Sequence, residues 1–298
     1  MKILLLGKDG QVGWELQRSL APLGEVLALN SRSRDYCGDL ADLQGIAQTV
    51  RSYMPDVIVN AAAYTAVDKA ESDRDLAFRV NAEAVRVLSH AAAECDALLV
   101  HYSTDYVFPG QGTVAWQEDD EVGPLNIYGE SKLVGEQAIQ ESGCAHLIFR
   151  TCWVYASRGN NFARTMLRLA SERDSLGVID DQFGAPTGAE LIADVTAHAI
   201  TAARREPSLS GLYHLAAGGE TTWCGYARFV LGHAAQLGVP LKVSAEQVNA
   251  LTTDAYPTPA KRPANSRLNT NKLQKAFALT LPDWRMGVAR MLNEIHEK

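Results

Sequence analysis

The chain of 298 residues has no long apolar segment. A membrane-spanning helix needs roughly 18 consecutive apolar residues, and no part of the sequence approaches that length. Near the N-terminus, the apolar run Ile3–Leu6 stops at Gly7-Lys8-Asp9, which is too short for the hydrophobic core of a signal peptide. We therefore expect a cytoplasmic protein that does not associate with a membrane.

Cysteine is scarce and unpaired in the sequence. The number of cysteines is odd, they are scattered along the chain, and none forms a C-x-x-C pair. This pattern argues against a disulfide framework and against the common zinc sites, and it fits reduced cytosolic thiols. The five are Cys37, Cys95, Cys144, Cys152 and Cys224.

An excess of positive charge is also missing. The chain has 28 Lys and Arg against 35 Asp and Glu, which gives a net charge of -7. Such a chain repels phosphodiester backbones, so we expect no nucleic-acid partner. The G-x-S-x-G, H-E-x-x-H and P-loop motifs are absent as well. The seven histidines lack the spacing of metal ligands, and we expect them at the surface or at helix caps.

The first half does contain a regular alternation of strand and helix patterns. Its short apolar segments are nearly continuous and are bounded by Gly, Pro, Asn or Asp, as in strands that are buried on both faces. The alternation predicts an α/β fold with a doubly wound, parallel Rossmann-type sheet. The expected strands are Lys2–Leu6, Glu25–Leu29, Asp56–Asn60, Ala97–Ser103 and His146–Thr151, and the expected helices are Val12–Leu20, Leu40–Ser52, Asp75–Glu94 and Tyr128–Glu141.

The pattern is looser beyond residue 151. We predict a dinucleotide-binding domain over residues 1–153 and a smaller, mixed substrate-binding domain over residues 154–298. Two strand-like segments, near 176–179 and 211–215, are expected to rejoin the main sheet. Helices are predicted at Phe162–Glu172, Ala189–Arg204, Cys224–Leu237 and Asp283–Glu297, with extended loops at Thr104–Ile127 and Thr252–Pro263.

Three glycines follow the first predicted strand and open the first predicted helix. Gly7, Gly10 and Gly13 allow a tight turn and a close approach of the backbone to a pyrophosphate. The N-terminus of the helix then favours the negative charge. The spacing is G-x-x-G-x-x-G, and the side chains at Lys8 and Asp9 are expected to face solvent.

The end of the second predicted strand is where a dinucleotide site distinguishes the two nicotinamide cofactors. An NAD-selective site places Asp or Glu there to hold the 2′-hydroxyl of the ribose. Here Asn30 stands at that place, and Arg32 follows closely. This arrangement tolerates a 2′-phosphate, so we expect NADPH to be used at least as well as NADH.

A tyrosine and a lysine lie four residues apart after the long loop. Tyr128 and Lys132 share one face of the predicted helix. An ammonium group beside a phenol lowers the pKa of the phenol, which can then donate a proton to a developing alkoxide and recover it. Thr104, at the end of the fourth predicted strand, is placed to hold the substrate oxygen.

These residues together resemble the extended short-chain dehydrogenases/reductases, and within them the dTDP-4-dehydrorhamnose reductase family. The resemblance covers nearly the whole chain. It is carried by the segments Ser103–Phe108, Arg150–Tyr155, Gly159–Phe162, Asp181–Thr187 and Arg262-Pro263.

The resemblance implies a set of roles and partners. It implies catalysis by Thr104, Tyr128 and Lys132, a dTDP-linked 4-keto-6-deoxyhexose as substrate, NADPH or NADH as cofactor, a homodimer, and a dependence on Mg²⁺ for which the sequence shows no ligands. The implied cofactor-binding residues are Gly7, Gly10, Gln11, Val12, Gly13, Asn30, Arg32, Asp39, Leu40, Ala62, Ala63, Tyr64, Tyr128 and Lys132. The implied substrate-binding residues are Thr104, Asp105, Tyr128, Trp153, Asn161 and Arg262.

Two alternatives have different consequences. A non-catalytic regulatory subunit that holds a dinucleotide has no chemical reason to keep the Tyr128/Lys132 pair. Another nucleotide-sugar reductase or an epimerase of the same superfamily would keep it. A dehydratase generally adds an acid pair beside the catalytic threonine, and Thr104-Asp105-Tyr106 contains only half of one.

Overall fold

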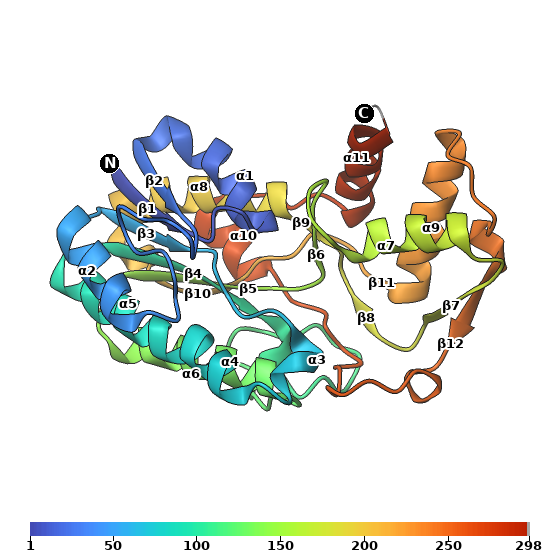
Figure 1. Cartoon of the computed structure of the whole chain (residues 1–298), viewed down its shortest axis with the longest axis horizontal. Helices are drawn as coiled ribbons and strands as arrows, with labels where there is room; N and C mark the ends of the chain where they lie inside the picture. Colours follow the sequence, from blue (N-terminus) through green and yellow to red (C-terminus); the bar gives the residue numbers. More distant parts are fainter. Residues whose placement is uncertain (297–298) are drawn as a thin grey trace.

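The computed structural model describes residues 1–296 and contains a central sheet of six parallel strands (Figure 1). Their spatial order is β10-β5-β4-β3-β1-β2. The chain leaves β1 toward one edge and returns on its other side, so the order reverses between β1 and β3. In a doubly wound sheet this switch point opens a crevice at the carboxyl ends of the strands. The strands are β1 (Lys2–Leu6), β2 (Glu25–Leu29), β3 (Val57–Asn60), β4 (Leu98–Thr104), β5 (His146–Thr151) and β10 (Gly211–His214).

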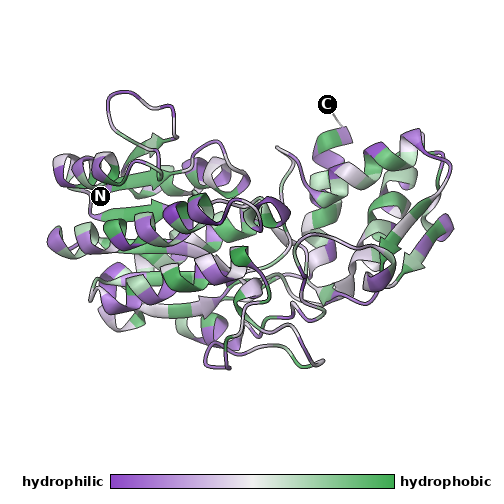
Figure 2. Cartoon of the chain, turned by 60° about the horizontal axis from the view of Figure 1, so that its bottom comes forward, coloured by the Kyte–Doolittle hydropathy of each residue, from purple (hydrophilic) through white to green (hydrophobic). Residues whose placement is uncertain are grey.

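Helices cover both faces of the sheet (Figure 1). Ile3 and Leu5 of β1 enter the core on one face, whereas Leu4 and Leu6 enter the core on the other. This is why the strand reads as an uninterrupted apolar run. One face carries α1 (Gln11–Leu20), α8 (Ala189–Arg205) and α10 (Asn271–Phe277), and the other carries α2 (Leu43–Tyr53), α5 (Ala84–Glu94) and α6 (Ile127–Glu141). Figure 2 shows the apolar strands between helices whose outer faces are hydrophilic. No helix within residues 1–296 is long and apolar enough to cross a membrane.

The helix predicted over residues 75–94 is interrupted. Two short helices, α3 (Val67–Ala70) and α4 (Arg74–Phe78), lead into a π-helical turn at Arg79–Glu83 before α5 begins. The side chain of Asn81 in this turn bonds to both backbone groups of Tyr64, N to Oδ1 at 2.9 Å and Nδ2 to O at 3.0 Å. Nδ2 of Asn81 also lies 3.0 Å from Oγ of Ser131 on α6. The turn therefore anchors the segment that follows β3.

The second half forms a smaller unit beside the sheet. Its apolar core joins α7 (Phe162–Glu172), α9 (Trp223–Gln236) and α11 (Trp284–His296). Three pairs of short strands complete it: β7 (Leu176–Ile179) with β12 (Val248–Leu251), β6 (Val154–Tyr155) with β9 (Thr187–Gly188), and β8 (Phe183–Gly184) with β11 (Thr221–Thr222). The last residue of the helix predicted at 283–297 lies outside the described residues.

One of the two predicted additions to the main sheet is confirmed and the other is wrong. Gly211–His214 pairs with β5 at the edge of the six-stranded sheet. Leu176–Ile179 instead pairs with β12 at the far end of the second half (Figure 1). The reason is packing, because Leu176 and Val178 belong to the apolar core of the second half.

The two halves are tied together by the long segments that looked irregular in the sequence. The Thr104–Ile127 connection runs beside residues 264–269, with hydrogen bonds from Asn265 N to Gly110 O and from Trp116 N to Arg267 O, both at 2.9 Å. Asn126 caps α6 through Gly129 N and donates to Lys261 O, each at 2.8 Å. The loop at 252–263 contains a short helical turn at Thr253–Ala255 and otherwise follows the prediction.

Candidate active site

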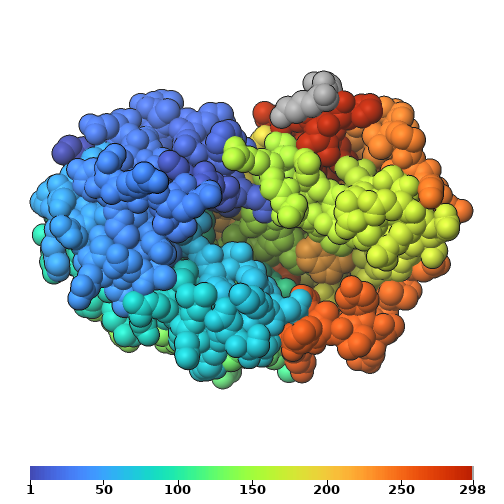
Figure 3. Space-filling model, viewed as in Figure 1, coloured from blue at the N-terminus to red at the C-terminus, as the bar shows by residue number. Residues whose placement is uncertain are grey.

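A cleft with a volume of about 690 Å³ lies at the carboxyl ends of the strands. It is lined by residues from the glycine turn, from the ends of β2, β3, β4 and β5, and by Tyr128 and Lys132 of α6, while Trp153, Val154 and Trp223 close it from the second half. Figure 3 shows the hollow between the two halves. Its size lies in the range of small-molecule and cofactor sites.

The glycine turn has the shape that an anion site requires. Gly7 has φ +84°, and a Cβ there would lie 2.7 Å from Ala62 N. A Cβ at Gly13 would overlap the carbonyl of Gly7, so Gly13 allows α1 to pack on the turn without lining the cleft. Gln11 and Val12 line the cleft, and their backbone N–H groups have no hydrogen-bond partner within residues 1–296. These free donors fit a pyrophosphate.

The end of β2 carries the expected residues and one that was unexpected. Asn30 and Arg32 line the cleft, as do Asp39 and Leu40. Asp9 lines it as well, and its Oδ2 lies 2.6 Å from Nδ2 of Asn30. Asp9 is exposed, as expected, and it also borders the cleft because the turn folds back toward the end of β2.

After β3, small side chains open the cleft. Ala61, Ala62 and Ala63 line it. Tyr64 does not, because its hydroxyl donates to Asp73 at 3.1 Å and its backbone is held by Asn81.

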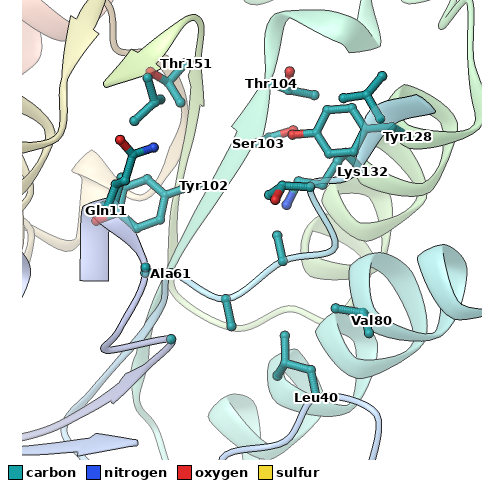
Figure 4. A pocket seen from close by; sticks show the side chains of 18 of the residues that line it. Gln11, Leu40, Ala61, Val80, Tyr102, Ser103, Thr104, Tyr128, Lys132 and Thr151 are labelled. Carbon is teal, nitrogen blue, oxygen red and sulfur yellow. The ribbon is translucent and has the colours of Figure 1, made fainter. Parts of the chain in front are cut away.

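Thr104, Tyr128 and Lys132 lie together on one side of the cleft, across from Gln11 (Figure 4). The Asn126 cap fixes where α6 begins. Gly129 allows the helix to approach the carbonyl of Tyr106, which brings Tyr128 toward Thr104. Burial raises the pKa of Tyr128 to about 12, against a smaller opposing effect of the Thr104 hydroxyl. The expected lowering of this pKa by Lys132 is therefore not observed.

Lys132 is buried against a histidine. It is 2% exposed, and its Nζ lies 3.0 Å from Nε2 of His101. Nδ1 of the same ring lies 3.2 Å from Nδ2 of Asn60. Burial lowers the pKa of Lys132 to about 8 and also lowers the pKa of His101 well below its ordinary value. The expectation that the histidines lie at the surface or at caps is wrong for His101 and also for His214, which are both buried strand residues.

Polar groups at the ends of β4 and β5 complete the catalytic side. Asp105 is buried, accepts a hydrogen bond from Thr104 at 3.1 Å, and has a pKa raised by burial to about 7. The hydroxyls of Ser103 and Thr151 are buried in the cleft wall and have no partner among the described residues. Buried hydroxyls that lack a protein partner are suited to bind the polar groups of a ligand.

The substrate-binding candidates of the second half are not all brought to the cleft. Trp153 lines it in a left-handed backbone conformation, φ +48°, and stacks on Trp223 with ring centroids 3.7 Å apart. Asn161 does not line it; it caps α7 and donates to Gln11 at 3.1 Å. Arg262 does not line it either, because its guanidinium pairs with Asp68 at 2.7 Å.

Several lining residues were missed by the sequence analysis. The position of Asp9 depends on tertiary contacts that no local pattern announces, and the same holds for His101, which contacts Lys132 and does not line the cleft. Others follow directly after identified positions and were within reach of the rule that ligands bind at strand ends. The missed lining residues include Asp9, Ser31, Gly38, Thr65, Val67, Val80, Tyr106, Thr151, Cys152, Val154 and Trp223.

Known proteins resemble the chain over its full length. The family model described as RmlD substrate binding domain matches residues 1–297. The dTDP-4-dehydrorhamnose reductase of Escherichia coli K12 is 61% identical, over 99% of this chain and 98% of that protein. The enzyme of the same name from Burkholderia thailandensis is 50% identical, over 99% of each chain. A crystal structure of dTDP-4-dehydrorhamnose reductase from Bacillus anthracis in complex with NADP is 33% identical, covers 98% of this chain and 99% of that chain, and has a TM-score of 0.87. The chain therefore belongs to the RmlD family, that of the dTDP-4-dehydrorhamnose reductases.

Proposed function

We propose that the chain catalyses the NAD(P)H-dependent reduction of the 4-keto group of dTDP-4-dehydro-6-deoxy-L-mannose, which yields dTDP-L-rhamnose. The observation that carries the proposal is the meeting of Thr104, Tyr128 and Lys132 at the rim of a cleft that also contains the glycine turn. A regulatory module that only holds a dinucleotide does not need this trio.

The cleft fits a nicotinamide dinucleotide along its length. The free N–H groups of Gln11 and Val12 would hold the pyrophosphate, and the end of β2 would hold the adenosine ribose. Lys132 would hold the nicotinamide ribose from the opposite side. When it is bound, the reduced cofactor supplies the hydride that the sugar carbonyl accepts.

Tyr128 is the proton donor in this mechanism. Because its pKa is about 12, the phenol keeps its proton at neutral pH and can donate it to the oxygen of the reduced sugar. Thr104 orients that oxygen from the end of β4. Donation leaves a phenolate, and the ammonium of Lys132 then stabilises it. A nearby opposite charge lowers the free energy of forming a charged group in a buried site.

The wider setting is proposed from the family alone. We propose a cytoplasmic homodimer that supplies dTDP-L-rhamnose for bacterial surface polysaccharide such as O antigen. The magnesium dependence implied by the resemblance finds no donor set here. Within residues 1–296 no three His, Cys, Asp or Glu side chains are grouped to hold a metal ion, and no step of the mechanism uses one.

The test is a cofactor-oxidation assay across a panel of nucleotide-linked 4-ketosugars. We expect turnover of the dTDP-linked 4-keto-6-deoxyhexose with NADPH and with NADH, and dTDP-L-rhamnose as the product. Tyr128→Phe serves as the control for catalysis by the cleft. Binding of the dinucleotide without oxidation by any sugar of the panel would instead support a regulatory module.

A further inference from the structure

The exposed carboxylate of Asp9 is hydrogen-bonded at the end of β2. Oδ1 of Asn30 accepts the backbone N–H of Arg32 at 2.9 Å, so this end of the amide must face Arg32. Nδ2 of Asn30 is thereby turned toward Asp9, whose Oδ2 it meets at 2.6 Å. A backbone N–H thus orients Asn30, and Asn30 in turn orients Asp9.

Asp9 lies at the end of the cleft where dinucleotide folds bind the adenosine ribose. Dinucleotide folds put a carboxylate at the end of the second strand, where it accepts hydrogen bonds from the ribose hydroxyls. In this chain the strand ends in a neutral amide, and a carboxylate reaches the same end of the cleft from the glycine turn. A carboxylate has about four lone-pair sites, so acceptor capacity remains after the bond to Asn30.

We propose that Asp9 is the residue that reads the 2′ position of the adenosine ribose. Its carboxylate accepts a hydrogen bond from the 2′-hydroxyl of NADH and repels the 2′-phosphate of NADPH. Arg32, which lines the same end of the cleft, attracts that phosphate. The preference between the cofactors is then a balance of two opposite charges, which explains how one site admits both. The inference rests on the proposed use of a dinucleotide.

The test measures binding without turnover. Affinities for NADH and for NADPH are determined from the quenching of tryptophan fluorescence, with no sugar present. Asp9→Asn removes the charge and keeps an oxygen that Asn30 can bond. We expect it to shift the ratio of the two affinities toward NADPH by about tenfold, and the shift to shrink as salt is added. Arg32→Ala should shift the ratio in the opposite direction.

Two further variants make the result specific. Asp35→Asn removes the same charge from a residue outside the cleft and should leave the ratio unchanged. Asn30→Asp places two carboxylates in contact, whereas the exchange Asp9→Asn with Asn30→Asp restores one carboxylate and one amide. We expect the exchange to return the ratio to within about threefold of that of the unchanged chain, because the net charge at the site is again the same.

The outcomes separate this inference from the proposed function. An unchanged ratio in Asp9→Asn, or an equal loss of affinity for both cofactors, would overturn the role of Asp9 and leave it as a brace for Asn30. Failure of the unchanged chain to bind either cofactor would overturn the proposed function itself.

Discussion

Burial sets the ionisation of Tyr128 and Lys132, the two side chains proposed to act in proton transfer. It raises the pKa of the phenol to about 12 and lowers that of the amine to about 8. Both shifts favour the neutral forms of the side chains. Tyr128 therefore keeps its proton at neutral pH, whereas Lys132 is close to losing its own, so activity should depend on pH through Lys132.

Replacing Tyr128 tests its proposed role as the proton donor. Tyr128→Phe should reduce kcat by about 10²–10⁴-fold, which is the usual contribution of general acid catalysis. The affinity for the cofactor should stay nearly unchanged, because the ring remains. Single-turnover kinetics and fluorescence titration measure the two effects. A variant that keeps near wild-type turnover would show that another group donates the proton.

His101 is a positioning residue, since it contacts Lys132 and not the cleft. The ammonium form of Lys132 is lost as the pH rises through about 8, so kcat/KM should fall above that pH. His101→Leu deprives the buried amine of its polar partner and should move this alkaline limb to lower pH by about one unit.

His101→Gln, which keeps a polar group beside Nζ of Lys132, is the matched variant for this prediction. Its alkaline limb should stay near that of the wild type. A pH–rate profile with the same limb in all three proteins would contradict the role of His101.

The site residues that could be identified from the sequence are those whose position depends on nearby residues in the chain. Tyr128 and Lys132 are recognised because helical spacing alone puts them on one face. Gly7 and Gly13 are recognised because only glycine fits there. Asp9 could not be predicted as a cleft residue, since its position depends on a hydrogen bond to a residue that is distant in sequence.

At the scale of elements, the π-helical turn at Arg79–Glu83 connects a helix to the cleft. The side chain of Asn81 makes two hydrogen bonds to Tyr64 in the segment after β3 and a third to Ser131 on α6. Asn81→Ala should lower the free energy of unfolding by about 1–3 kcal/mol, because buried backbone groups of Tyr64 lose their partners. It should also weaken cofactor binding, since Ala62 and Ala63 of the same segment line the cleft.

Chemical denaturation and a cofactor titration measure these two effects. Asn249→Ala, at an exposed position on β12, is the control and should change neither. Full cofactor affinity in Asn81→Ala would mean that the turn stabilises the fold without shaping the cleft.

Strands could be predicted from the sequence where burial on both faces of the sheet requires a continuous apolar run. The five strands of the first half follow from their apolar runs, and their observed bounds differ from the predicted ones by at most one residue. The short segment at 176–179 carries the same local pattern but pairs with β12. Four residues do not determine their partner, because the choice is made by the core against which Leu176 and Val178 pack.

At the scale of the whole molecule, the Arg262–Asp68 pair connects the second half to the first. The side chains are 26% and 42% exposed, so the pair should contribute about 1 kcal/mol or less. We expect Arg262→Ala to lower Tm by about 2 °C and to leave KM for the nucleotide sugar nearly unchanged. A melting curve and steady-state kinetics decide the matter. A raised KM with an unchanged Tm would restore the assignment of Arg262 to the diphosphate.

The stack of Trp153 on Trp223 lies in the wall that the second half contributes to the cleft. The planes of the two indoles differ by 14°, at a centroid distance of 3.7 Å. Chromophores this close share their excited states, so the pair should give an exciton couplet in circular dichroism. Trp153 lies two residues after the end of β5, and Trp223 is the first residue of α9. Both indoles line the cleft, so a ligand that displaces either ring would change the couplet, and the protein carries its own optical reporter of ligand binding.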